Sequence, residues 1–296
     1  MIMGKIPMKV VRLLRAIGLN RFRFLTSFYR KWLPRIIKRD IPIRYKEANL
    51  VMYVPVASAH NFLRWWDYEP CTMALFRRVI NQGMTVVDIG AFFGIYTLIA
   101  ARDVGNEGRV IALEPDPSNF RILENNIKAN NLTNVTCLQK AAFDKDTVIN
   151  LYRHSTPGHH SVIDSSDIIE VIKVSAIRLD NYLKAIPDVI KMDIEGGEPK
   201  ALEGMRRTLE KAGRLVLISK YEPRLLKKSG LKDPEMYLSM IRSFGFEIFI
   251  ILEEQQKIIS FGEMLPKMWD SEGTINLFCV KGYTEQEVSN LLTATK

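Results

Sequence analysis

The sequence has 296 residues, of which 47% are hydrophobic and 25% are charged, a composition typical of a soluble globular protein with a sizeable core. Its three cysteines form no C-x-x-C pair and no apolar run reaches about 18 residues, so it predicts neither a structural zinc site nor a membrane-spanning helix. Basic residues interrupt the first apolar stretch, which argues against a signal peptide, and we expect a cytoplasmic protein.

The formal net charge of +9 is concentrated near the start of the chain, in a basic arm that spans residues 1–40. Residues 1–39 hold eleven Lys or Arg and no acidic residue, whereas the remainder carries 31 basic and 33 acidic side chains. Apolar residues recur at helical spacing within this arm, which makes it amphipathic. Such a segment is typical of a helix on an anionic membrane surface, but the same stripe could dock on the rest of the protein. Binding of an RNA backbone is a third interpretation, because basic charge does not distinguish one source of phosphate from another.

Residues 41–82 are predicted to hold short strands followed by an introductory helix. Residues 51–54 are the clearest strand candidate, and residues 69–81 carry an apolar stripe at helical spacing. The main domain is expected over residues 83–283, with a strand insertion at about residues 145–177. Residues 284–296 are expected to form a C-terminal tail.

The first strand of the main domain leads into a glycine turn. An apolar run reaches Asp88, and Gly90 and Gly94 then precede a segment with helical periodicity. At the carboxyl end of a parallel strand, such glycines let the backbone approach a ligand closely. The next strand, residues 109–113, ends at Glu114, in the position of a carboxylate that accepts hydrogen bonds from a ribose diol. These residues predict a nucleotide-binding corner.

Strands and helices continue to alternate along the chain, which predicts βαβ units and a parallel sheet. The insertion contains two alternating, half-exposed strands at residues 148–152 and 168–174. The last two strands are joined by a long irregular loop, which favours an antiparallel edge pair. The expected helices cover residues 117–131, a segment opened by residues 195–198, and residues 234–244. The expected strands cover residues 135–140, 188–193, 215–218, 246–252 and 275–280.

Six blocks of sequence follow one another along the chain: Tyr68–Pro70, Gly83–Ala91, Glu114–Asp116, Pro157–Ser161, Leu179–Asp180 and Ile190–Glu198. Together they resemble the class I S-adenosylmethionine-dependent methyltransferases of the FkbM type, over about residues 68–250. The resemblance implies a Rossmann-like α/β fold with a mostly parallel, seven-stranded sheet whose last strand is antiparallel. It also implies S-adenosylmethionine as the cofactor, bound at the switch point of the sheet, and usually methylation of a hydroxyl oxygen.

The resemblance places the methyl donor at the carboxyl ends of the first strands. Glu114 would bind the ribose hydroxyls, Asp88 would hold the glycine loop, and Ala142 and Phe143 would flank the adenine. A nicotinamide dehydrogenase would use the same glutamate, but it would prefer glycine where Phe92 stands, because a pyrophosphate lies across that loop. The expected cofactor-binding residues are Asp88, Gly90, Ala91, Gly94, Glu114, Pro115, Asp116, Ala142, Phe143 and Asp193.

Carboxylates and histidines are the candidates for the acceptor side. Asp193 and Glu195 follow the fourth strand, and Asp193 is expected to orient the acceptor or to accept its proton. In the Gly-His-His-Ser turn, His159 is preferred over His160 as a base. The plainer interpretation is that the two carboxylates cap the next helix and that the turn only shapes the pocket. Some related methyltransferases bind a divalent cation at such carboxylates, but no metal ligands can be assigned here.

Two positions depart from the family pattern. Phe92 stands where Asn is common, so a polar contact near the cofactor is lost. Lys220 stands where an acidic residue is frequent at the end of the fifth strand. Both changes concern the side of the site that would receive the acceptor.

The expected reaction is O-methylation of a small metabolite, or of a sugar hydroxyl on a glycan or lipid-linked carrier. The basic arm would hold such an enzyme on the cytoplasmic face of an anionic membrane as a peripheral protein. Two alternatives stay open. One is an RNA methyltransferase whose arm binds the RNA backbone, and the other is a protein that binds S-adenosylmethionine without catalysis.

Overall fold

The computed structural model describes residues 40–45, 49–56, 58, 69–154, 160–164, 168–261 and 274–293. The basic arm up to residue 39 and His159 therefore lie outside the described residues. Across the described ranges, the helices lack the combination of length and apolar content that crossing a bilayer requires.

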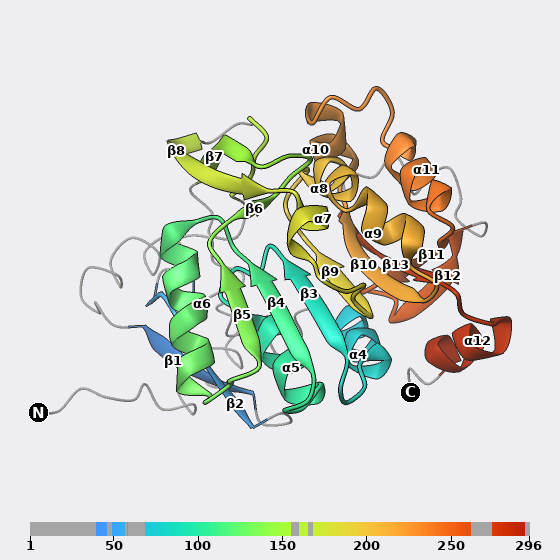
Figure 1. Ribbon diagram of the computed structural model, residues 1–296, viewed down its shortest axis with the longest axis horizontal. Coiled ribbons are helices and arrows are strands. Elements are labelled where there is room, and N and C mark those ends of the chain that lie inside the picture. The colour runs from blue at the N-terminus through green and yellow to red at the C-terminus, as the bar shows by residue number, and fades with distance from the viewer. Residues whose placement is uncertain are drawn as a thin grey trace, which may run out of the picture.

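An eight-stranded sheet forms the centre of the described structure (Figure 1). From one edge to the other its strands are β12 (Lys257–Ser260), β11 (Glu247–Leu252), β13 (Ile275–Lys281), β10 (Leu215–Tyr221), β9 (Val189–Met192), β3 (Thr85–Ile89), β4 (Arg109–Leu113) and β5 (Val135–Leu138). The five strands from β10 to β5 are parallel to one another. β13 is antiparallel to both of its neighbours, β10 and β11.

This sheet confirms the expected Rossmann-like α/β fold with a mostly parallel sheet and a reversed last strand. Two details of the prediction are wrong. The sheet has eight strands and not seven, because the unpredicted β12 pairs with β11. The expected antiparallel pair of β11 and β13 is present, but β12 forms the edge beyond it. Both strands are almost continuously buried, which suits central positions with both faces covered.

Alternate residues of the central strands face two separate hydrophobic cores, as Val86 and Val87 of β3 do. One core packs against α4 (Pro70–Val79), α5 (Ile95–Asp103), α6 (Pro117–Ala129) and α12 (Glu285–Thr293). The other packs against α7 (Leu179–Tyr182), α8 (Glu198–Gly204), α9 (Arg206–Lys211), α10 (Pro223–Lys228) and α11 (Glu235–Ser243). The region expected to be a C-terminal tail thus contributes a helix to the first core, through Val288.

A smaller sheet occupies the predicted insertion. It consists of β6 (Ala141–Ala142), β7 (Thr147–His154) and β8 (Ile168–Ile177), in the order β6-β8-β7. Leu151 and Ala176 form a small core of their own within it. Tyr152 pairs with Ser161, so the chain after β7 folds back along the hairpin.

A separate hairpin of β1 (Ile41–Tyr45) and β2 (Leu50–Val54) packs against α6. Asn126 of this helix and Asn130, its C-cap residue, each exchange two hydrogen bonds with the β2 backbone, at Tyr53 and Val51 respectively. The side-chain amides thereby satisfy the edge of β2 as a neighbouring strand would.

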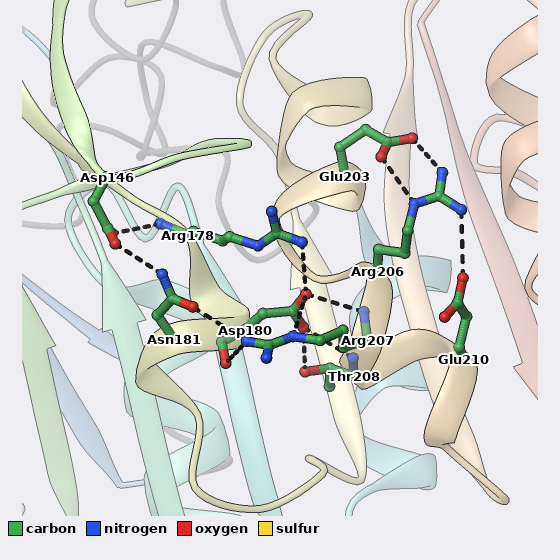
Figure 2. Close-up of polar contacts among 9 residues, drawn as sticks. All are labelled: Asp146, Arg178, Asp180, Asn181, Glu203, Arg206, Arg207, Thr208 and Glu210. Carbon is green, nitrogen blue, oxygen red and sulfur yellow. Dashed lines mark hydrogen bonds and ion pairs between the residues drawn. The ribbon is translucent and has the colours of Figure 1, made fainter.

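Two helices receive their N-terminal caps from distant parts of the chain. Figure 2 shows Asp180, whose carboxylate accepts hydrogen bonds from the backbone N–H groups of Arg207 (3.0 Å) and Thr208 (2.9 Å) in the first turn of α9. Glu253, which follows β11, accepts from the N–H groups of Cys71 and Thr72 in α4. Each carboxylate satisfies donors that lack a partner within their own helix.

Candidate functional site

An open cavity lies where the carboxyl ends of β3, β4 and β9 meet the insertion sheet. The chain leaves β3 toward β4 and β5 and later returns to β9 on the other side of β3, so this is the switch point of the sheet. The cavity has an empty volume of about 570 Å³, which includes space open to solvent. Its lining residues are Ile89, Gly90, Phe92, Leu113, Glu114, Pro115, Asn119, Lys140, Ala141, Ala142, Leu151, His160, Val162, Asp193, Ile194 and Glu195.

Glu114 is held at the end of β4 with its carboxylate in this cavity. The side chain is buried, Oε2 accepts a hydrogen bond from the Phe92 N–H (2.9 Å), and Oε1 accepts one from the Asp116 N–H (2.9 Å). Burial raises the pKa of Glu114 to about 7, although these backbone donors favour the charged form. Since a carboxylate has about four acceptor positions, the group can still accept a hydroxyl donor from a ligand.

The glycine loop is shaped by the protein's own packing. Gly90 has a φ of +83°, and a Cβ on it would lie 2.1 Å from the carbonyl oxygen of Asp193. A Cβ on Gly94, with a φ of +96°, would lie 2.5 Å from Leu123 Cδ1. The glycines therefore let the β3 loop meet the β9 loop and α6. Phe92 is also in the left-handed region, at +53°, and this conformation aims its N–H at Glu114.

The structure separates the predicted cofactor-binding residues into two groups. Residues in the first group line the cavity: Gly90, Glu114, Pro115, Ala142 and Asp193. Residues in the second group lie outside its lining: Asp88, Ala91, Gly94, Asp116 and Phe143.

Asp88 and Asp116 of the second group each fix a helix. Asp88 accepts a hydrogen bond from the Thr97 hydroxyl of α5 (2.5 Å), and burial raises the pKa of Asp88 to about 6. Asp116 is the N-cap of α6 and accepts from the N–H groups of Ser118 and Asn119. These two aspartates therefore hold α5 and α6 in place and do not line the cavity themselves.

The loop after β9 carries Asp193 and Glu195, and both line the cavity. Neither caps α8, whose N-cap is Gly197, without a side-chain cap. The buried Glu198 instead accepts a hydrogen bond from the Ile194 N–H (3.0 Å), and burial raises the pKa of Glu198 to about 8. On the other side, the Ser161 hydroxyl donates to the Glu195 carbonyl (2.6 Å). The loop is therefore fixed on both sides, and the helix-cap interpretation does not describe it.

The histidine turn contributes one described residue to the cavity. His160 lines it, and its Nδ1 accepts a hydrogen bond from the His154 N–H (3.3 Å). In that arrangement Nδ1 carries no proton. His159, the histidine preferred from the sequence, lies outside the described residues.

A cluster of charged groups adjoins the cavity at Asp193; we call it the charge cluster, and it consists of Glu69, Tyr96, Lys191, Asp193 and Lys220. Lys220 Nζ lies 2.7 Å from Glu69 Oε1 and 3.3 Å from Asp193 Oδ2. The Tyr96 hydroxyl donates to Glu69 Oε2 (2.7 Å). Burial opposes the ionisation of Glu69, but the charges of Lys220 and Lys191 outweigh it and lower the pKa of Glu69 to about 2.

Sequence reasoning missed three members of this cluster, Glu69, Tyr96 and Lys191. Glu69 and Lys191 occur in blocks that carry the family resemblance, which was the available signal. Glu69 also combines a left-handed φ of +45° with a following proline, although a residue before proline normally favours an extended backbone. Such strain is concentrated at functional sites.

The described residues offer little support for the metal alternative. Within those ranges, no three His, Cys, Asp or Glu side chains are grouped closely enough to hold a metal ion. The ammonium groups of Lys191 and Lys220 lie 3.6 and 3.3 Å from Asp193, where they would repel a cation.

Comparison with solved structures finds similar chains of low sequence identity. A methyltransferase FkbM from Methylobacillus flagellatus KT is 20% identical, with a TM-score of 0.43, over 66% of this chain and 43% of that one. A putative methyltransferase from Streptococcus mutans in complex with SAH is 8% identical (TM-score 0.45; 72% and 96% covered). An O-methyltransferase from Bacillus cereus, also in complex with SAH, is 16% identical (TM-score 0.44; 72% and 81% covered).

The chain thus spans less than half of the Methylobacillus protein, and no curated protein matches it significantly. All three TM-scores lie below 0.5, so the assignment to a family rests on a different finding. A family profile described as Methyltransferase FkbM domain matches residues 88–270, which is more than half of the chain and includes Glu114 and Asp193. The protein belongs to the FkbM methyltransferase family.

Proposed function

We propose that the protein transfers a methyl group from S-adenosylmethionine to a hydroxyl oxygen of a small metabolite, or of a sugar on a glycan or lipid-linked carrier. The observation that carries the donor assignment is Glu114: a buried carboxylate, fixed by two backbone N–H groups, at the switch point of the sheet. Its charged oxygens suit a ribose diol.

The cavity around Glu114 fits an adenosine better than a dinucleotide. Leu113 and Ala142 offer apolar contacts to a purine, and Asn119 adds a polar group beside them. Phe92 occupies the loop where a pyrophosphate would need a close backbone approach. A donor without phosphates is compatible with that side chain.

The proposed chemistry is an in-line displacement. When bound, S-adenosylmethionine supplies a methyl carbon attached to a positively charged sulfur. The acceptor oxygen forms a bond to this carbon as the carbon–sulfur bond breaks, and the hydroxyl proton passes to a base of the protein. Asp193 is the proposed base or orienting group, because it lines the cavity and the loop around it is fixed by Glu198 and Ser161.

Glu195 and the two histidines are the alternative proton acceptors. Glu195 lines the cavity with a left-handed φ of +54°, and His160 faces the same space. Asp193→Asn, Glu195→Gln, His159→Gln and His160→Gln therefore form the set that identifies the base. The variant that lowers kcat with little change in donor affinity has lost the proton acceptor.

Calorimetric titration tests the donor. The wild-type protein should bind S-adenosylmethionine and S-adenosylhomocysteine but not NAD, and Glu114→Ala should weaken binding at least tenfold, because it removes two charge-assisted hydrogen bonds. Glu210→Ala is the control, since that carboxylate is exposed on α9. Tight binding of NAD, or unchanged affinity in Glu114→Ala, contradicts the donor assignment.

Acceptor assays then separate an enzyme from a binding protein. Release of S-adenosylhomocysteine with sugars, glycolipids or small hydroxylated metabolites supports O-methylation. Retention of RNA that weakens steeply with salt, together with methylated RNA, supports the RNA alternative instead. Donor binding with no product from any acceptor would leave a non-catalytic protein.

We also propose that residues 1–39 bind an anionic membrane surface. The support is their eleven basic side chains without an acidic one, arranged along an apolar stripe. Deleting them should abolish sedimentation with phosphatidylserine vesicles at low salt, while the full chain should not sediment with neutral phosphatidylcholine vesicles. Unchanged sedimentation of the shortened protein rejects this proposal.

A further inference from the structure

Lys191 is a buried cation that takes no part in the proposed methyl transfer. It lies in β9, paired in register with Asp88 of β3 and Ile218 of β10, and its side chain is only 1% exposed. Among the described residues its Nζ makes no hydrogen bond. The nearest carboxylate oxygen, Asp193 Oδ2, is 3.6 Å away, and the ring centre of Tyr96 is 4.8 Å away.

An ammonium without hydrogen-bond acceptors is costly to bury. Three N–H donors of Lys191 need an oxygen acceptor, and a negatively charged one would compensate the charge as well. Lys220 differs, because it contacts both Glu69 and Asp193. Asp193 and Glu69 compensate part of the charge of Lys191, but among the described members of the charge cluster Lys191 is the cation whose N–H donors are left for an oxygen of a ligand.

The position of Lys191 relative to the cavity indicates which end of a ligand it can reach. Glu114 follows β4, Lys191 lies near the end of β9, and β3 separates these two strands. Neighbouring strands are about 4.8 Å apart, so the backbones of β4 and β9 are separated by about 10 Å. Glu114 follows Leu113, which is level with Met192, so Lys191 lies two residues deeper in the sheet than Glu114. Lys191 does not line the cavity itself, but Asp193 does, and Asp193 Oδ2 lies 3.6 Å from Lys191 Nζ, so Lys191 lies directly behind the cavity wall at Asp193. A ligand with its ribose on Glu114 would bring the opposite end toward Lys191.

The surroundings of Lys191 also favour an anion. The described contacts of its ammonium are one carboxylate oxygen at 3.6 Å and the face of the Tyr96 ring, so a short, charge-assisted hydrogen bond is still missing. The burial of Lys191 disfavours contact with a large acceptor that enters from solvent. A small, fixed anionic group of the donor fits this position better.

We propose that Lys191 binds the α-carboxylate at the amino-acid end of the methyl donor. This inference rests on the proposed function, since it assumes that the donor is S-adenosylmethionine with its ribose on Glu114. It assigns a binding role to a side chain outside the predicted cofactor set. The contact would also discriminate between ligands, because nucleosides without a carboxylate at that end should bind more weakly than those that carry one.

Three ligands separate this contact from the rest of the site. S-adenosylhomocysteine carries the carboxylate, its decarboxylated analogue keeps only the ammonium, and 5′-methylthioadenosine lacks the whole amino-acid end. The wild type should bind S-adenosylhomocysteine at least tenfold more tightly than the decarboxylated analogue. Lys191→Met should weaken the binding of S-adenosylhomocysteine by a similar factor. It should change the affinities for the other two ligands by less than twofold.

The control variant is Lys200→Met, which removes a half-exposed lysine on α8 that pairs with Asp144. It should leave all three affinities unchanged. Circular dichroism and a thermal melt verify that Lys191→Met is folded, and if it is not, the comparison of ligands on the wild type still decides.

The possible failures are distinct. Equal wild-type affinity for S-adenosylhomocysteine and its decarboxylated analogue overturns the proposal, and so does an equal loss for all three ligands in Lys191→Met. A variant with lower kcat but unchanged affinity for S-adenosylhomocysteine places Lys191 at the acceptor oxygen and also overturns it. Failure of the wild type to bind both S-adenosylhomocysteine and 5′-methylthioadenosine contradicts the proposed function itself.

Discussion

Single residues at the site adopt backbone conformations that most side chains resist. Glu69, Phe92 and Glu195 all have a φ near +50°, and Glu69 is followed by proline as well. Each such residue costs of the order of 1–3 kcal/mol, which the surrounding structure must supply. Each contacts or adjoins a charged group of the site. Phe92 follows β3 and donates to Glu114, which follows β4. Glu195 lies in the β9 loop with Asp193, and Glu69 pairs with Lys220 of β10.

Gly90 offers a prediction at this scale, with Gly83 as a matched control. Both have a φ of +83°, but a Cβ on Gly83 would meet nothing within 4 Å, whereas one on Gly90 would overlap the Asp193 carbonyl. Gly83→Ala should cost about 1–2 kcal/mol of unfolding free energy from backbone strain alone. Gly90→Ala should cost more and should also lower methyl transfer, because it displaces Asp193.

Urea unfolding and donor titration of the two variants measure the difference between them. If Gly90→Ala is no less stable than Gly83→Ala, the close contact between the β3 and β9 loops is wrong.

Glu114 predicts how donor affinity depends on pH. A ribose diol donates to the ionised carboxylate, and burial raises the pKa of Glu114 to about 7. Below that pH, part of the binding free energy is used to deprotonate Glu114. Affinity should rise with pH and be about tenfold weaker at pH 6 than at pH 8. The suitable probe is 5′-methylthioadenosine, which keeps the ribose and has no amino-acid end to titrate. Glu114→Gln should bind weakly with a flat profile, whereas a profile as steep as that of the wild type would assign the titration to another group.

Two helices are capped by carboxylates that lie outside the helix and its flanking residues. α4 is capped by Glu253 and α9 by Asp180. The contact of Glu253 with Cys71 joins residues 182 positions apart. Local sequence predicts the helices, but only the packed fold brings these caps to them.

Asp180 carries the prediction at the scale of elements. Its side chain is fully buried and accepts from the Thr208 hydroxyl (2.9 Å) and from Arg178 (3.3 Å), in addition to the two backbone N–H groups of α9 (Figure 2). Asp180→Asn should lower the unfolding free energy by about 2–3 kcal/mol, because buried donors lose a charged acceptor. Glu203→Gln, at an exposed pair with Arg206 in the same figure, should change it by less than about 0.5 kcal/mol.

The pH dependence of this cap has a definite sign. Burial opposes ionisation of Asp180, yet its hydrogen-bond donors lower its pKa below the usual value. Its stabilisation is therefore present above the unfolded pKa of about 4 and is lost as the pH falls below it. The difference in melting temperature between wild type and Asp180→Asn should shrink from pH 6 to pH 3. A constant difference would show that the charge of Asp180 is not what stabilises α9.

At the scale of the whole molecule, three buried carboxylates around the site work against stability at high pH. Burial raises the pKa of Asp88, Glu114 and Glu198 to about 6, 7 and 8. A raised pKa gives stability that is present below the unfolded pKa of about 4 and is lost as pH rises through the folded value. Without ligand, the unfolding free energy should fall between pH 5 and pH 8.

Urea unfolding at each pH measures this decline. Glu198→Gln should remove the decline in unfolding free energy above pH 7. The glutamine amide oxygen can still accept from the Ile194 N–H, but the side chain cannot become charged. S-adenosylhomocysteine should reduce the decline, since its ribose favours the ionised form of Glu114. A free energy that rises toward pH 8 in the ligand-free protein would contradict the three raised pKa values.

Much of the fold could be read from local sequence. The period of apolar residues predicted most of the central strands, the helix from Pro117 and the separate insertion, because these patterns record which face of an element is buried. The sequence did not predict β12 or α12, which are short elements at the periphery of the described fold. It placed β11 and β13 at the edge, since strand order depends on contacts that no local pattern contains.

What the sequence determined by itself was the chemistry at the strand ends: a glycine loop after β3, a glutamate after β4 and an aspartate after β9. The tertiary structure decided which of these groups line the cavity, and it joined Glu69 to Lys220, 151 positions away. The physical reason is that a buried charge and a solvated one look alike in a sequence. Strand register and the burial of neighbouring side chains alone set Lys191 apart from the chain's many exposed lysines.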